Sequence, residues 1–194
     1  MAFDYKTILS QVVLTLRDPR ASARWVINQG IPTRQAWEIL LVVILGNVVL
    51  AGILSITLGG SLEGAGFLGP FGLAALQAGF LWVLVHLVDK VGRKMGGVGT
   101  LSQSIMAIAW MQVVLLVLQI ALLIIFQIIP VGPGYVNIIA VGAFFWLLSN
   151  FVAELHGFSS RLLVFIGILV GMFALGLLLS LIFAFLGVEI SGSV

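Results

Sequence analysis

Four side chains in the sequence have the chemistry to hold a metal ion or move a proton: His86, Asp89, Glu154 and His156. His86 and Asp89 are three residues apart, so on a helix they share one face. Two imidazoles and two carboxylates could bind a divalent metal or relay a proton. The simpler hypothesis is a set of polar groups at a membrane surface, with Asp89 and Glu154 paired to His86, Lys90 or Arg161.

Three glutamines form a second candidate site: Gln112, Gln119 and Gln127. Steps of seven and eight residues place them within an arc of about 80° on one helix. Inside a membrane such amides usually hydrogen-bond to neighbouring helices, at roughly 0.6 to 2 kcal/mol each. Two hypotheses stay open for this intramembrane stripe: packing between helices, and the lining of a polar cavity.

The composition identifies the elements that must position these side chains. Of 194 residues, 61% are hydrophobic and 8% are charged, whereas soluble domains carry about 25% charged residues. So much apolar surface needs lipid around it, which excludes a soluble globular protein. The sequence has no cysteine and a net charge of +2, so neither thiolate chemistry nor a nucleic-acid partner is expected. No nucleophile, zinc or phosphate-binding motif occurs, and we expect no cofactor and no enzymatic activity.

Several apolar stretches are long enough to cross a membrane, which takes about 20 residues. The predicted spans are residues 37–59, 68–88, 105–129, 135–155 and 162–186. The predicted fold is therefore all-α, a polytopic membrane bundle of five transmembrane helices over residues 36–194. A cytoplasmic leader, residues 1–35, precedes it.

Basic residues predict the orientation of this bundle. All nine Lys and Arg residues fall on one side of it: Lys6, Arg17, Arg20, Arg24, Arg34, Lys90, Arg93, Lys94 and Arg161. Because positively charged loops stay in the cytoplasm, we expect a cytoplasmic N-terminus and an external C-terminus. The polar leader before the first span predicts no cleavable signal peptide.

The leader contains an amphipathic segment over residues 3–17. Its apolar stripe is typical of a helix that lies in the membrane interface, and a helix that docks on a partner protein is the alternative. Asp18 and Pro19 predict the cap and first turn of a second short helix. Four arginines are expected to contact anionic lipid headgroups: Arg17, Arg20, Arg24 and Arg34.

Small residues in the last span predict close approach between helices. The candidate packing residues are Gly167, Gly171, Gly176 and Ser180. Steps of four residues keep small side chains on one face, and the five-residue step between the second and third rotates the face by about 140°. We therefore expect two small faces, one for the bundle and one for lipid, a second copy or a foreign subunit.

Three local sequences resemble the Yip family, the five-span membrane proteins that interact with Ypt and Rab GTPases. They are Leu16-Arg17-Asp18-Pro19, the turn from Gly96 to Ser104 leading into Ala107 to Trp110, and Glu154-Leu155-His156-Gly157-Phe158-Ser159. In eukaryotic members the resemblance implies binding of prenylated small GTPases, roles in Golgi and endoplasmic reticulum traffic, and effects on membrane shape. This sequence lacks their long polar domain and its Tyr-Gly-Pro type motif, so GTPase binding is not carried over.

The compact leader and bare outer loops are similar to the short bacterial relatives, which implies a place in the bacterial inner membrane. We expect a non-enzymatic protein that organises the membrane or acts as an accessory or scaffold subunit. Its partners would be membrane lipids and either a protein or a second copy bound through the spans. The alternative is a small ion-coupled or solute transporter or channel that uses the two polar sites.

Overall fold

A computed structural model describes residues 5–57, 69–128 and 134–185. Every element in these ranges is an α-helix. The helices are α1 (Tyr5–Arg17), α2 (Pro19–Ile27), α3 (Thr33–Thr57), α4 (Gly69–Lys94), α5 (Leu101–Ile128), α6 (Gly134–His156) and α7 (Arg161–Phe185). The predicted all-α class is confirmed over this part of the chain.

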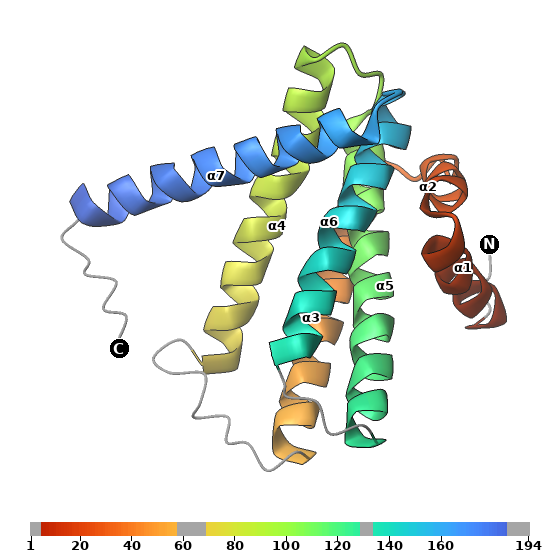
Figure 1. Cartoon of the computed structure of the whole chain (residues 1–194), viewed down its shortest axis with the longest axis vertical. Helices are drawn as coiled ribbons and strands as arrows, with labels where there is room; N and C mark the ends of the chain where they lie inside the picture. The colour runs from red at the N-terminus through yellow and green to blue at the C-terminus, as the bar shows by residue number, and fades with distance from the viewer. Residues whose placement is uncertain (1–4, 58–68, 129–133, 186–194) are drawn as a thin grey trace.

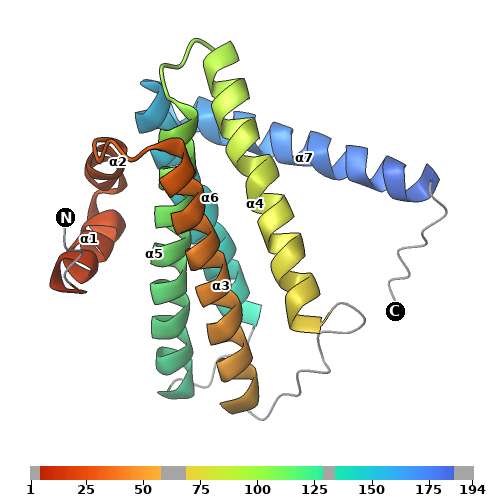
Figure 2. The same ribbon diagram turned by 180° about the vertical axis from the view of Figure 1, so that it is seen from behind.

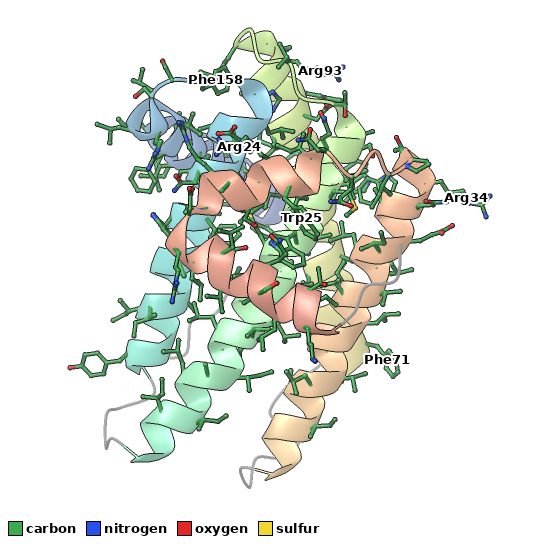
Figure 3. The ribbon with its side chains drawn as sticks, turned by 90° about the vertical axis from the view of Figure 1, so that its right-hand side faces the viewer. Arg24, Trp25, Arg34, Phe71, Arg93 and Phe158 are labelled. Carbon is green, nitrogen blue, oxygen red and sulfur yellow. The ribbon has the colours of Figure 1, made fainter. Side chains whose placement is uncertain are left out.

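Helices α3 to α6 run side by side in alternating directions and form the body of the molecule (Figure 1). Each has a stretch long and apolar enough to cross a membrane, so the protein is an integral membrane protein. Large apolar side chains from all four helices meet in the core, among them Leu40, Leu81, Ile108, Leu147 and Phe151. The ends that carry Arg34 and Arg93 lie at one end of the bundle, opposite Phe71 (Figure 3).

The four helices extend beyond the predicted spans at the end of the bundle that carries Arg34 and Arg93. A helix continues past the hydrocarbon wherever its side chains tolerate water.

α4 and α6 end in the same way. Gly96 and Gly157 take φ of 90° and 72°, and the next amide donates to the carbonyl five residues back, at 2.9 Å after Gly96 and 2.8 Å after Gly157. These are Schellman motifs, which need the left-handed conformation that glycine adopts without strain.

The fifth span is not confirmed. The described apolar part of α7, Arg161–Leu177, is shorter than a span, and the helix leaves the bundle at a steep angle to α4 and α6 (Figures 1 and 2). The residues that follow α3 (58–68) and α5 (129–133), and the C-terminal residues from 186 on, lie outside the described residues, and the predicted outer connections fall largely within them.

The leader folds into α1 and α2, which lie together against the bundle (Figure 2). Asp18 caps α2 by accepting the amide of Ala21 at 3.0 Å, and Pro19 occupies the first turn, as predicted. The apolar stripe of α1 is divided: Val12 is buried, whereas Leu9 is 58% exposed. The interfacial position of α1, and the division into a leader (1–35) and a membrane domain (36–194), stay predictions.

Candidate functional site

Elements that contain or adjoin the segments of the family resemblance meet at one end of the bundle, and we call this region the polar cap. It comprises α2, the turn between α4 and α5 (residues 95–100), and the C-terminal end of α6 with the following turn (residues 154–160). In Figure 3, Arg24, Arg93 and Phe158 are close to this end of the molecule.

Glu154 joins α6 to the leader. Its carboxylate lies 3.0 Å from Arg24 Nη1 and 3.8 Å from Arg20 Nε, with 18% of the side chain exposed. The Arg20 Nη2 atom also donates to the Phe158 carbonyl at 3.2 Å. These contacts bring together residues that are about 130 positions apart in the sequence, so α2 is bound to the end of α6 by charge as well as by packing.

A buried hydroxyl pair joins α1, α2 and α5. The Thr15 hydroxyl donates to the Gln11 carbonyl at 2.7 Å, so the Ser22 hydroxyl is the donor in the 2.7 Å bond between the two side chains. Trp110 Nε1 donates to the same Thr15 oxygen at 3.0 Å. Thr15 and Ser22 are fully buried, and a satisfied network of this kind fixes the leader in one orientation.

His156 is buried in a pocket of glycines. A Cβ atom on Gly92 or Gly97 would overlap its imidazole, so these positions accept no larger residue without movement. The Gly99 amide donates to Nδ1 at 3.3 Å. Nε2 therefore carries the proton and donates to the Val88 carbonyl at 3.0 Å, which identifies a neutral imidazole. The side chain is 2% exposed and acts as a spacer that holds three segments together.

The remaining two candidates have other partners. The Asp89 carboxylate is 2.7 Å from Arg93 Nη2, four residues along α4, and not paired with a histidine or Lys90 as the simpler hypothesis proposed. His86 stacks on Trp82 with ring centroids 4.3 Å apart and on Trp37 at 6.0 Å. Its Nδ1 atom lies 2.8 Å from the Trp82 carbonyl.

The four candidates thus do not converge on one site. In the described ranges, no three His, Cys, Asp or Glu side chains lie close enough together to hold a metal ion. Arg20 and Arg24, which contact Glu154, were both predicted to contact lipid headgroups, whereas Arg93, which pairs with Asp89, was not. The contacts of the cap therefore attach the leader to the bundle.

The other predicted sites are spread over the molecule. Gln112 is half-buried and Gln119 is exposed on α5, and the Gln127 side chain lies outside the described residues. Within the described part, the side chains of Gln112 and Gln119 form no hydrogen bond, so their role stays a prediction.

On α7, a Cβ on Gly171 would lie 3.3 Å from Leu87 of α4, which is close packing. A Cβ on Gly167 or Gly176 would meet nothing within 4 Å, and Ser180 is exposed. The small faces of this helix are therefore largely open toward whatever surrounds the protein.

Among the predicted headgroup contacts, Arg34 pairs with Glu38 at 3.0 Å and has a 91% exposed side chain. Arg17 is exposed as well. Arg20 and Arg24 contact Glu154, as described above, and Arg24 still exposes 55% of its side chain. Contact of these arginines with lipid stays a prediction.

A capping box that was not predicted from the sequence begins α5. The Gln103 amide donates to Thr100 Oγ1 at 3.3 Å, and the Thr100 amide donates to Gln103 Oε1 at 3.0 Å. Thr followed three residues later by Gln is a recognisable helix start. The neighbouring Ser102 hydroxyl donates to the Ile31 carbonyl, which attaches the α2–α3 connection to the same cap.

Comparison with known proteins gives one finding. The family model described as the Yip1 domain matches residues 13–182. Searches of the curated proteins and of the solved structures gave no match. The matched range contains all three segments of the polar cap, and the match confirms the resemblance to the Yip family.

Proposed function

The chain belongs to the Yip1 domain family, and on that premise we propose that it is a non-enzymatic accessory or scaffold protein of the bacterial inner membrane. In this role the polar cap keeps the leader and the bundle together as one body. The membrane-embedded surface, above all α7, binds another integral membrane protein or a second copy.

The exposed apolar surface of α7 carries this proposal. The helix is uncharged after Arg161, and it presents large apolar side chains on several sides, with Val170 62%, Phe173 75% and Leu177 54% exposed. In the described part it packs mainly on α6. A helix that is apolar all round and covered on one side only needs lipid or protein on the others.

We further propose that α7 is the fifth span, with the N-terminus in the cytoplasm and the C-terminus outside. Its 25 residues would extend about 37 Å as an α-helix, which exceeds the roughly 30 Å of the hydrocarbon core. An odd number of spans puts the termini on opposite sides. This agrees with the sequence, in which every lysine and arginine lies in the leader or in the connections predicted to be cytoplasmic.

The polar cap supports a structural role over transport. Its buried ionisable side chains, Asp89 and His156, lie near helix ends and contact Arg93 and backbone groups. Ion-coupled carriers generally place such groups near the middle of the membrane. The transport alternative predicts solute or ion flux into proteoliposomes that contain the purified protein, whereas a scaffold predicts none above empty vesicles.

Site-specific photocrosslinking in cells tests the binding surface. A photoreactive phenylalanine analogue at Phe173 should give one main crosslinked protein, identified by mass spectrometry as a second copy or another integral membrane protein. The same analogue at Phe71, which is 87% exposed on α4, is the matched control and should give no discrete species. Lipid adducts alone at both positions, with a monomer in mild detergent, would refute the scaffold role.

A further inference from the structure

A cavity of about 520 Å³ lies between α6 and the first turn of α7. Five of its lining residues come from one face of α6, at spacings of three and four: Gly142, Phe145, Trp146, Ser149 and Asn150. Arg161, Leu162 and Phe165 of α7 line it at the cap end. Its size falls within the roughly 300 to 1,000 Å³ of small-molecule sites in proteins.

The far end of this cavity is apolar and open. A Cβ on Gly142 would meet nothing within 4 Å, so the glycine leaves a groove on the surface of α6. Phe145 and Trp146 flank the groove, and Trp146 is 42% exposed. At this depth in the membrane, a groove of this shape and composition accommodates a hydrocarbon chain.

The cap end of the cavity is polar and has unused hydrogen-bonding capacity. Asn150 is 3% exposed. Its Nδ2 atom donates to the Trp146 carbonyl at 2.8 Å, but its buried Oδ1 atom has no partner among the described residues. An orphaned acceptor in a buried site is costly, so it indicates a donor that comes from a ligand.

Arg161 supplies positive charge at the same end. It is exposed, and its side chain forms no ion pair or hydrogen bond within the described ranges, unlike Arg20, Arg24, Arg34 and Arg93. It is also the first residue of α7, where the helix dipole adds partial positive charge. A phosphate group matches this arginine, because guanidinium and phosphate form strong, paired hydrogen bonds.

We propose that this cavity is a binding site for one anionic glycerophospholipid. The phosphate lies on Arg161, a headgroup hydroxyl donates to Asn150 Oδ1, and one acyl chain follows the groove beside Gly142. Phosphatidylglycerol has both the phosphate and the hydroxyl donors, whereas the choline headgroup of phosphatidylcholine has no donor. The site requires only that the protein is embedded in a membrane, and it is independent of the scaffold role.

Native mass spectrometry of the full-length protein tests this site with the two lipids, matched in their acyl chains. We expect a one-to-one complex with phosphatidylglycerol, at several-fold higher occupancy than with phosphatidylcholine. Arg161→Gln should weaken binding of phosphatidylglycerol about tenfold, since it removes a charge-assisted contact. Arg161→Lys should keep more of the affinity, because the positive charge remains.

A second variant acts at the other end of the cavity. Gly142→Leu should reduce the binding of both lipids, because the side chain enters the groove at a position where its Cβ meets no protein atom within 4 Å. Arg34→Gln and Gly46→Leu are matched controls: Arg34 is an exposed arginine at the same end of the bundle, and a Cβ on Gly46 also meets nothing within 4 Å. Thermal unfolding in detergent confirms that each variant is folded.

Three results would overturn the proposal. One is equal occupancy by the two lipids. Another is an Arg161→Gln variant whose binding equals that of the Arg34→Gln control. The third is a pair of results that would identify a site for free phosphate: millimolar glycerol phosphate displaces the lipid, and Gly142→Leu does not change lipid binding.

Discussion

The glycine pocket around His156 makes a steric prediction that a single methyl group can test. A Cβ atom added to Gly97 would overlap the imidazole of His156. The φ angle of Gly97 is not positive, so the backbone accepts alanine and only the space for its methyl group is missing. Overpacking of this kind costs about 1 to 3 kcal/mol. Replacing glycine by alanine also lowers the backbone entropy of the unfolded chain, which offsets about 0.4 to 1 kcal/mol of this loss of stability.

We therefore expect Gly97→Ala to lower the free energy of unfolding by about 1 to 2 kcal/mol. For a chain of this length the melting temperature should fall by roughly 2 to 8 °C. The assay is thermal unfolding of the full-length protein in one detergent. Gly46→Ala is the matched control, and because a Cβ there has open space, it should leave stability equal or raise it by up to about 1 kcal/mol.

A double-mutant cycle with His156→Ala identifies the cause. His156→Ala alone removes two hydrogen bonds and leaves a cavity, at a cost of about 2 to 4 kcal/mol. In the double variant the new methyl group enters space that the imidazole has vacated. The combined loss should then be smaller than the sum by about 1 kcal/mol or more. An additive cycle, or a neutral Gly97→Ala, would refute the steric reasoning.

Three further predictions concern the cap and the topology. Glu154→Gln should weaken the attachment of α2 by only about 1 kcal/mol, because one of the two arginines that contact Glu154 is largely exposed. Hydrogen exchange of the α2 amides should become faster. The control Glu38→Gln, which removes an exposed ion pair with Arg34, should leave that exchange unchanged. Purified protein should carry no stoichiometric zinc, iron or manganese in elemental analysis, and a bound metal lost on removing both histidines would restore the metal-site hypothesis. In intact cells an impermeant thiol reagent should label Ser61→Cys and Ser193→Cys but spare Val98→Cys, and the opposite pattern would reverse the proposed orientation.

Features of the fold that depend on a few adjacent residues could be predicted from the sequence. Long apolar runs gave the four helices that are able to cross a membrane. The cap of α2 by Asp18 follows from a short side chain followed by Pro19. The capping box at Thr100 and Gln103 belongs to the same class, since its signature is also local.

The chemistry of the cap could not be predicted in the same way. Which cation meets Glu154 depends on where α2 lies against α6, and no periodicity in either segment specifies that. His156 illustrates the second difficulty: a histidine at the end of an apolar stretch looks like an exposed interface group, yet it is almost completely buried. Its burial becomes predictable only together with Gly92 and Gly97, which lie in a different helix and turn and make the space for it.

The last helix marks the limit of the reasoning from composition. A stripe of apolar residues on an otherwise polar helix indicates which face is covered, because only that face avoids water. α7 has no such stripe, since it is apolar on every side, and so its sequence predicts lipid surroundings without predicting a direction of packing. Small residues are the remaining signal, and of Gly167, Gly171 and Gly176 only Gly171 approaches another helix. What covers the other faces depends on molecules outside this chain, which is why binding experiments on α7 carry more information about function than further analysis of its sequence.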